Sequence, residues 1–340
     1  MYFKIDNINR VVLLGGGALL LALVRWCKSE STNISVVTAP RHAKEIVENG
    51  KSLKSILSNE KVPFLVTKDI DSDEVAKFLG DFNSTFYLSI GAAWIFKQNI
   101  IKNLFNGKLL NLHGTRLPQN RGGGGFSWQI MMGNRLGFCQ LHLVETGVDT
   151  GNIVKTKEFL YPPYCRIPKH YQEIYIKKNI DFVASFIQEI RQGGIAIETT
   201  KQAEYFSSYF PRLSTREHGW INWNDEIMQL ERFICAFDEP YEGAKCFWRD
   251  QTVFIKKVCV DLHDQNFHPY QSGIVYRKND NWLNVCAKGG SLIIEDITDS
   301  KGNNLIQKIK VGDRLITKSK TLDERKKRVL FLPSGEKKSK

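Results

Sequence analysis

The stretch N-L-H-G-T-R-L-P-Q-N-R, residues 111–121, decides how the fold of this chain is interpreted. It continues an apolar, strand-like run at 108–112 and leads directly into four glycines, Gly122–Gly125. Alternate residues of a strand point to the same side. Asn111 and His113 are therefore expected to present an amide and an imidazole to one place, beside a glycine turn whose backbone can approach a ligand closely.

The segments before this stretch alternate between short apolar runs and helical patterns. Such alternation predicts an α/β fold, with a mostly parallel, Rossmann-like sheet and helices on both faces. Expected strands are 11–14, 34–38, 64–66, 86–90 and 108–112, and expected helices run from the glycines at 15–17 to about Lys28, then over 42–57, 72–79 and 100–104. Ligands of such sheets bind beyond the carboxyl ends of the strands. Three segments are expected to converge there: Gly15–Gly17, Ser89–Phe96 and Asn111–Arg116.

The pattern changes after about residue 151. Amphipathic helices are expected over 169–191 and 225–237, and short strands at 252–258, 273–276, 282–286 and 291–297. Short strands separated by turn residues predict a small β-barrel or open roll. We therefore divide the chain into an α/β domain at 1–205, a connecting segment with a helix at 206–245, a β-barrel-like domain at 246–316 and a basic tail at 317–340.

Composition bears on the partners and the cellular environment of the protein. The 340 residues carry a formal net charge of +12, and the last thirty hold ten Lys or Arg against four Asp or Glu. We interpret these residues as a solvated tail in preference to a nucleic-acid site, although a phosphate-bearing substrate would also suit a positive field. Seven scattered cysteines without a C-x-x-C pair favour a reducing cytoplasm. The apolar run Val11–Val24 is shorter than the roughly 20 residues of a membrane span, so none is expected.

The polar residues leave several interpretations open. The glycines of G-G-G-A-L-L at 15–20 depart from G-x-G-x-x-G, and they indicate tight strand-to-helix packing more than a dinucleotide site. Asn111 and His113 suit an oxyanion with an acid or base beside it, but such a pair also occurs as a hydrogen-bonded strand end. His142 and Asp149 flank the end of another expected strand, where the carboxylate could orient an imidazole. A metal site of His113, His142 and Asp149 matches no zinc spacing.

Two segments together resemble a known family. N-L-H-G-T-R-L-P-Q-N-R-G at 111–122 resembles the N-x-H-x-S-L-L-P-x-x-R-G signature of formyltransferases that use 10-formyltetrahydrofolate. G-V-D-T-G-N-I-V at 147–154 resembles the D-x-G-x-I element of the same family. Y-F-P-R at 209–212 and G-W-I-N-W at 219–223 are similar to landmarks of its long members, which close with a small β-barrel. The resemblance spans about residues 9–300.

The resemblance implies a role for each matched residue. Asn111, His113 and Asp149 would transfer a formyl group from 10-formyltetrahydrofolate to a primary amine, with no metal. The residues implied to contact the folate are Gly91, Ala93, Trp94, Ile95, Phe96, Val144, Glu145 and Gly147. Those implied to contact the acceptor are Thr115, Arg116, Gly122, Gly123, Gly124 and Phe126.

Departures from the family pattern bear on the acceptor. Thr115 stands where the family has Ser, Arg116 where it has Leu, and Gly125 where it usually has Pro. Members that act on tRNA also carry a basic, glycine-rich insertion after the second strand. Here T-A-P-R-H-A-K-E-I-V at 38–47 is expected to enter a helix directly. We therefore expect the acceptor to be a nucleotide-linked amino-deoxysugar, as in lipopolysaccharide O-antigen synthesis, with arginines on its phosphates and aromatic residues such as Tyr241 on its base.

Three other functions stay open from the sequence. They are methionyl-tRNA formyltransferase, formyltetrahydrofolate hydrolase, and an RNA-binding protein with a vestigial site. Nucleic acid is the less favoured partner and a homodimer is compatible with the sequence. The sugar and the nucleotide are not specified by it.

Overall fold

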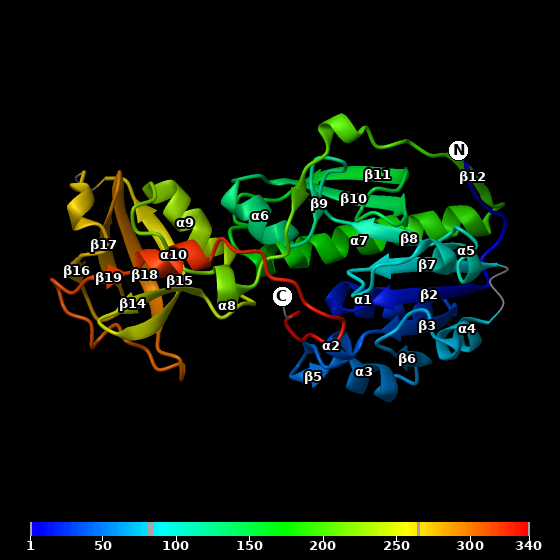
Figure 1. Cartoon of the computed structure of the whole chain (residues 1–340), viewed down its shortest axis with the longest axis horizontal. Coiled ribbons are helices and arrows are strands. Elements are labelled where there is room, and N and C mark those ends of the chain that lie inside the picture. Colours follow the sequence, from blue (N-terminus) through cyan, green and yellow to red (C-terminus); the bar gives the residue numbers. More distant parts are fainter. Residues whose placement is uncertain (1, 81–83, 264–265, 339–340) are drawn as a thin grey trace.

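The computed structural model of the chain describes residues 2–80, 84–263 and 266–338. Two units lie side by side along the long axis: an α/β unit and a smaller, β-rich unit (Figure 1). In the described part of the chain, no helix is both long and apolar enough to cross a membrane. The core of the second unit also takes in Tyr161 and Tyr171 of the first. The domain boundaries at 205 and 245 stay predictions.

A seven-stranded sheet forms the centre of the α/β unit, in the order β11-β10-β8-β7-β2-β3-β6. The strands from β8 to β6 are parallel, and β10 and β11 are antiparallel at the other edge. The predicted mostly parallel sheet is therefore confirmed. The bounds are β2 Arg10–Gly15, β3 Asn33–Thr38, β6 Phe64–Val66, β7 Thr85–Ile90, β8 Leu110–His113, β10 Leu136–Leu143 and β11 Ile153–Leu160.

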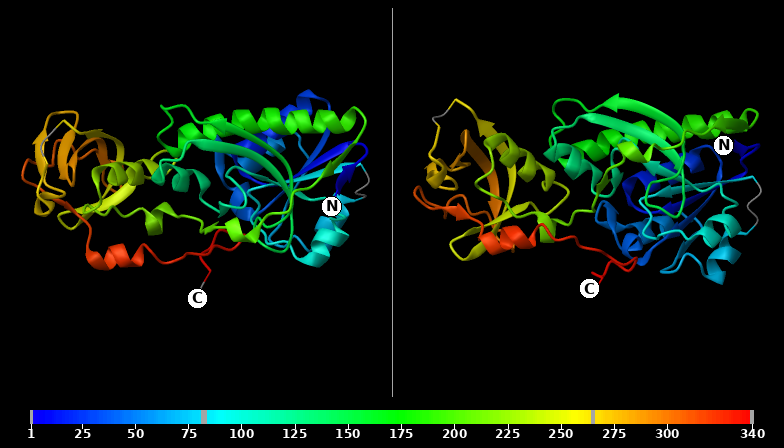
Figure 2. Two further views of the ribbon diagram at one scale, coloured as in Figure 1. Left: turned by 90° about the horizontal axis from the view of Figure 1, so that it is seen from above. Right: turned by 45° about the horizontal axis from the view of Figure 1, so that its top comes forward.

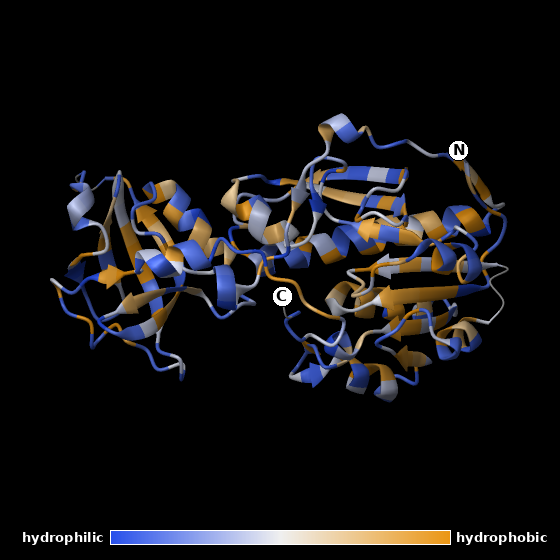
Figure 3. Ribbon diagram, viewed as in Figure 1, coloured by the Kyte–Doolittle hydropathy of each residue, from blue (hydrophilic) through white to orange (hydrophobic). Residues whose placement is uncertain are grey.

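Successive residues of β2 enter two different cores, and this is why helices cover both faces of the sheet. Val11 and Leu13 point into one core, and Val12 and Leu14 into the other. The first core is covered by α1 Gly17–Ser29, α3 Leu53–Asn59 and α7 Pro168–Arg191, and the second by α4 Asp73–Leu79 and α5 Gln98–Asn103. The central strands β2 and β3 are largely apolar (Figure 3), as expected for parallel strands buried on both faces.

The predicted helix over 42–57 is wrong. The chain instead forms α2 Pro40–Ala43, a hairpin of β4 Ile46–Glu48 and β5 Lys51–Ser52, and then α3. Asn49 and Gly50 have φ angles of 49° and 72°, which are the left-handed values of a two-residue hairpin turn that favours Asn-Gly. Ser52 then caps α3, because its Oγ accepts a hydrogen bond from the Ser55 amide at 3.2 Å.

The C-terminal unit is a six-stranded antiparallel sheet that curls on itself, in the order β16-β17-β18-β15-β14-β19 (Figure 2). Its two ends meet because Ile274, just before β16, bridges Arg314, just before β19. The predicted small barrel-like unit is therefore confirmed. The bounds are α9 Ile227–Ala236, β14 Ala244–Trp248, β15 Gln251–Asp261, β16 Val275–Lys278, β17 Leu283–Ala287, β18 Gly290–Thr298 and β19 Leu315–Ile316.

The remaining elements are short and connect or flank the two units. They are the antiparallel pair β1 Tyr2–Ile5 and β12 Ile195–Glu198, the parallel pair β9 Arg121–Gly122 and β13 Tyr209–Phe210, the helices α6 Gly125–Met131, α8 Thr215–His218 and α10 Ser319–Glu324, and the 3-10 turns Glu204–Phe206 and Pro269–Gln271.

The basic side chains of the tail, Lys326, Lys327, Arg328 and Lys337, are exposed, but the chain that carries them packs against the rest of the protein. After α10 the chain returns to the α/β unit and reaches α2 (Figures 1 and 2). Arg328 donates to the Tyr209 hydroxyl at 3.2 Å, and the Lys337 ammonium pairs with the Glu217 carboxylate at 3.2 Å. Residues 339–340 of the predicted tail lie outside the described residues.

Candidate active site

Two antiparallel strands, β8 and β10, bring the polar cluster together. In their register, Asn111 lies opposite His142, and His113 lies opposite Gln140. Because Asn111 and His113 are two residues apart on β8, both side chains leave the same face of the sheet. The imidazole of His142 therefore joins them from the neighbouring strand.

Asp149 reaches the cluster from the loop between β10 and β11. Its backbone has φ of 54°, a left-handed value that Asp tolerates better than most residues. The Gly122 amide donates to its Oδ2 at 2.9 Å, and the Gln202 amide Nε2 donates to its main-chain oxygen at 2.9 Å and to that of Gly151 at 2.7 Å. The carboxylate is thus held by the glycine turn, and its loop by Gln202, which follows β12.

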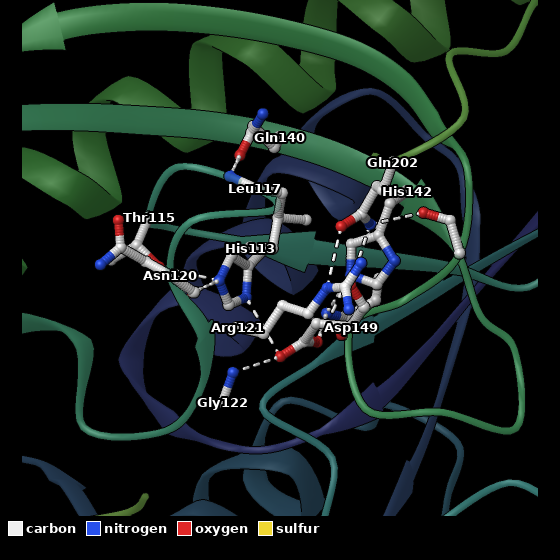
Figure 4. A network of polar contacts seen from close by, with 12 residues as sticks. His113, Thr115, Leu117, Asn120, Arg121, Gly122, Gln140, His142, Asp149 and Gln202 are labelled. Atoms are coloured by element: carbon white, nitrogen blue, oxygen red, sulfur yellow. Dashed lines mark hydrogen bonds and ion pairs between the residues drawn. The ribbon is translucent and has the colours of Figure 1, made fainter. Parts of the chain in front are cut away.

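The Asp149 carboxylate lies beside both His113 and His142 (Figure 4), and the Asn111 amide contacts His142 and Asp149. Asn111 Nδ2 is 3.0 Å from His142 Nε2 and 3.4 Å from Asp149 Oδ1. His113 Nδ1 is 3.8 Å from Asp149 Oδ2, and His142 Nε2 is 3.5 Å from Asp149 Oδ1. The structure therefore brings the three predicted catalytic residues together and adds His142 to them.

The hydrogen bonds of the two rings indicate where their protons lie. His113 Nε2 is 2.8 Å from the Asn120 carbonyl oxygen, which can only accept, so Nε2 carries the proton. Thr115 Oγ1 lies 2.8 Å from the same nitrogen. His142 Nδ1 faces the Leu143 carbonyl oxygen at 2.8 Å and is the donor there. In the neutral rings, His113 Nδ1 is then a free acceptor, whereas His142 Nε2 accepts from the Asn111 amide at 3.0 Å.

Burial and charge set the protonation states of the pair. Burial raises the pKa of Asp149, but His113, His142 and the Gly122 amide outweigh it and hold that pKa at about 2. Burial lowers the pKa of His113, and the Asp149 carboxylate opposes this effect. Near neutral pH the cluster therefore combines an ionised carboxylate with a neutral imidazole that can accept a proton.

A histidine titration tests this assignment. We expect the His113 ring, followed by NMR with carbon-13 histidine labelling, to titrate below the ordinary value of about 6.5. Asp149→Asn removes the charge that favours the protonated ring, so the midpoint should fall further. Activity should accordingly be lost as the pH falls through this pKa, because the protonated ring accepts no proton. A midpoint above about 6.5, or one that rises in the variant, would contradict the assignment.

A cavity of about 560 Å³ opens over the cluster. The predicted folate-contacting residues that line it are Gly91, Trp94, Ile95, Phe96, Val144, Glu145 and Gly147, and the predicted acceptor-contacting residues that line it are Gly122, Gly123, Gly124 and Phe126. Ala93 is not among its lining residues. Ile95 and Val148 are 68% and 42% exposed at its wall, which gives the cavity an apolar surface suited to a ring.

Two predicted acceptor contacts lie elsewhere. Thr115 is buried beside His113 and donates to the Asn120 carbonyl at 2.9 Å, so it supports the ring and does not line the cavity. The structure does not bring Arg116 to the cavity, because the chain turns after it: the Asn120 amide donates to the Arg116 carbonyl at 2.7 Å. The Arg116 side chain is left exposed while Leu117 is buried.

Some residues of the site carried little or no signal in the sequence. The sequence indicates His142 as a strand-end partner of Asp149 and as a candidate metal ligand, but it gives no sign that His142 lies opposite Asn111. Arg121 is buried, and its Nε donates to Gln202 Oε1 at 3.1 Å while Nη1 pairs with Glu204 at 2.8 Å. Gln202 lies far from Arg121 and Asp149 in the sequence and belongs to no motif. Nothing in the sequence therefore indicates that it contacts Arg121.

The three predicted metal-ligand candidates do form a compact group. Ligand atoms of His113, His142 and Asp149 lie within 4.8 Å of one another. The amide of Asn111, however, already donates to the acceptor nitrogen of His142 in the neutral ring. The expectation that the site works without a metal stays a prediction.

One glycine of the turn is required by geometry. Gly122 has φ of 103°, and a Cβ there would lie 2.1 Å from the Phe210 carbonyl oxygen. We expect Gly122→Ala to lower the free energy of unfolding by roughly 2 kcal/mol or more. The control is Gly193→Ala, where no atom lies within 4 Å of the added carbon. Equal stability of the two variants in urea unfolding would contradict this account.

Comparisons with known proteins identify the family of the chain. A family model described as "Formyl transferase" matches residues 9–163, and one described as "Formyl transferase, C-terminal domain" matches residues 214–308. A methionyl-tRNA formyltransferase from Rickettsia bellii is 22% identical over 278 residues, which cover 81% of this chain and 87% of that protein. The bifunctional polymyxin resistance protein ArnA of Wigglesworthia glossinidia brevipalpis is 26% identical over 319 residues, covering 88% of this chain and 45% of that protein.

Two solved structures share the fold. WlaRD, described as a sugar 3N-formyl transferase in the presence of dTDP and 5-N-formyl-THF, gives a TM-score of 0.63 at 17% identity and covers 85% of this chain and 98% of its own. An N-formyltransferase from Helicobacter canadensis, in complex with folinic acid and dTDP-3-aminofucose, also gives a TM-score of 0.63 at 17% identity. The match covers 85% of this chain and 99% of that one.

Proposed function

The chain belongs to the formyl transferase family, and from that premise we propose that it transfers a formyl group from 10-formyltetrahydrofolate to the amine of a nucleotide-linked amino sugar. The observation that carries the proposal is the cluster of Asn111, His113 and Asp149 at the cavity of about 560 Å³. It combines an amide donor, a neutral imidazole and an ionised carboxylate at one place. Those are the groups that acyl transfer to an amine needs.

In the reaction, one proton is lost from the attacking nitrogen and one is gained by the folate nitrogen. The neutral amine attacks the formyl carbon, and the carbonyl electron pair moves onto oxygen to give a tetrahedral oxyanion. The bond from that carbon to the folate nitrogen then breaks. The attacking nitrogen loses a proton and the folate nitrogen gains one, so the products are the N-formyl sugar and tetrahydrofolate.

His113 is the group that moves this proton. Its Nε2 is fixed by the Asn120 carbonyl, so Nδ1 accepts the amine proton and later returns it to the folate nitrogen. Asp149 lies 3.8 Å from Nδ1 and stabilises the positive ring between the two steps. The low pKa of Asp149, about 2, keeps its charge available throughout.

Asn111 provides the donor for the oxyanion. One N–H of its amide is held by His142 Nε2 at 3.0 Å. Asp149 Oδ1 lies 3.4 Å from the same nitrogen, which is long for a hydrogen bond and weak. An N–H of this amide can therefore turn from the carboxylate to the oxyanion, where negative charge develops only during the reaction.

The short connection between β3 and α2 favours a sugar nucleotide over tRNA as the acceptor. A single residue, Ala39, separates β3 from α2, and the small hairpin β4–β5 comes next. The basic insertion of tRNA-acting members has no counterpart here. Arg41 and Arg212 line the cavity instead, and guanidinium groups suit the phosphates of a sugar nucleotide.

Methionyl-tRNA is the second candidate acceptor. It is favoured by the 22% identical relative from Rickettsia bellii, whose alignment covers 81% of this chain, and by the formal charge of +12. A positive surface attracts nucleic acid without specifying it.

The test is tetrahydrofolate release from 10-formyltetrahydrofolate. It would be run with a panel of amino-sugar nucleotides, with charged initiator tRNA and with no acceptor. Release that requires one amino-sugar nucleotide is the expected result. Release only with tRNA would contradict the proposed acceptor. Release without any acceptor would indicate a hydrolase. No release from any mixture would favour an RNA-binding role.

A further inference from the structure

A second cavity, of about 300 Å³, adjoins the catalytic cavity. The two share several lining residues, which are Arg41, Gly124, Arg212, Leu213 and Tyr241. The second cavity lies on the side of the C-terminal unit, since Phe237 and Thr215 also line it. A long ligand that reaches the catalytic cluster could therefore extend from one cavity into the other.

The C-terminal segment forms part of the wall of this second cavity, through Phe331 and Gly335. Residues 330–338 form a small hairpin in which the Leu332 amide donates to the Glu336 carbonyl and the Lys338 amide to the Leu330 carbonyl, both at 2.8 Å.

The hairpin is seated on the α/β unit. A Cβ at Gly335 would lie 3.1 Å from Cβ of Arg41, so the turn of the hairpin rests on α2. Lys337 pairs with Glu217, and Val329 at the base of the hairpin is buried. The last described residues of the chain are thus folded against the same arginine that lines both cavities.

The two arginines of these cavities make no close ion pair in the described part of the chain, although the charge of the Glu45 carboxylate acts on both. Among the described residues, neither Arg41 nor Arg212 makes an ion pair, and Arg41 Nε donates to His42 Nε2 at 3.2 Å. Burial and then the charge of Arg212 lower the pKa of Arg41 to about 10, and Glu45 opposes this only in part. Two guanidinium groups that repel each other beside a cavity are stabilised when an anion binds between them.

We propose that this second cavity binds the nucleoside diphosphate part of the acceptor, with Arg41 and Arg212 on its phosphates and the C-terminal hairpin, residues 329–338, as one wall. Phe331 and Tyr241 would then border the nucleoside. The proposal rests on the proposed function, because it supposes that the acceptor carries a nucleotide. It makes the C-terminal segment of this chain a determinant of acceptor binding.

The first test uses the arginine. Binding of UDP, dTDP, GDP and CDP to the full chain would be measured by titration calorimetry, for the wild type and for Arg212→Ala. Loss of a charged hydrogen bond should weaken the best of these ligands about 10- to 100-fold. Arg216→Ala is the matched control, because Arg216 is exposed on the same segment and lines neither cavity.

The second test uses the hairpin. Phe331→Ala should weaken the same nucleoside diphosphate about tenfold, as expected for the loss of a stacked ring. Leu332→Ala should not, because Leu332 is the neighbouring residue, is 40% exposed and lines neither cavity. The Michaelis constant for 10-formyltetrahydrofolate should stay unchanged in both variants.

The outcomes separate this inference from the function on which it rests. Binding that is weakened by Arg212→Ala and by Phe331→Ala, but not by the control variants Arg216→Ala and Leu332→Ala, supports the inference. Wild-type protein that binds none of the four nucleotides, or variants that bind like the wild type, would overturn it. If an amino-sugar nucleotide is still formylated in that case, the function stands and only the placement of the nucleotide fails.

Discussion

Asp149→Asn is expected to slow tetrahydrofolate formation about 100- to 10,000-fold when both substrates are saturating. The substitution keeps the size of the side chain but removes its charge. The imidazolium of His113, 3.8 Å away, would then lack the carboxylate that stabilises it. The amide oxygen can still accept from Gly122, as Oδ2 does at 2.9 Å, so the loop should keep its conformation.

The matched control is Glu158→Gln, which converts an exposed carboxylate on β11 to an amide. It should leave kcat and the thermal unfolding midpoint unchanged. An Asp149→Asn variant that unfolds at the wild-type temperature and turns over within a few-fold of the wild type would contradict the role assigned to the carboxylate.

His113→Ala is expected to produce a loss of similar size, about 100- to 10,000-fold in kcat. The ring carries the proton from the attacking amine to the folate nitrogen. His142 cannot replace it, because one of its ring nitrogens faces the Leu143 carbonyl and the other accepts from the Asn111 amide. His263→Ala, at an exposed histidine of the C-terminal unit, is the control.

The double variant tests whether the two groups act as one unit. Because Asp149 works through the ring of His113, the double variant should be no slower than the slower single variant. Losses that multiply would mean that Asp149 and His113 contribute by separate routes, and the proton path through the ring would then be wrong.

Much of the α/β unit could be predicted because its signals are local. The apolar strands, the glycine turns and the distance between Asn111 and His113 on one strand are all written in short segments. The missed hairpin at 46–52 shows the limit of this approach. The apolar residues Ile46, Leu53 and Ile56 have helical spacing, and this pattern hid the Asn-Gly turn that the structure uses.

Contacts between distant segments were not predictable in the same way. Gln202 meets Arg121 and the Asp149 loop only because the chain after β12 folds back over the catalytic cluster. The C-terminal hairpin meets Arg41 for the same kind of reason. Neither contact has a sequence signal, since each depends on how segments far apart in the sequence pack and not on a local pattern.

The most direct test of the central claim follows the formyl carbon itself. 10-Formyltetrahydrofolate labelled with carbon-13 at the formyl group would be mixed with excess wild-type protein and the best amino-sugar nucleotide, and the label followed by NMR. The account predicts that the label appears as an amide on the sugar, at a rate that falls strongly in Asp149→Asn. Label that appears as free formate, or that stays on the folate with every acceptor, would contradict it.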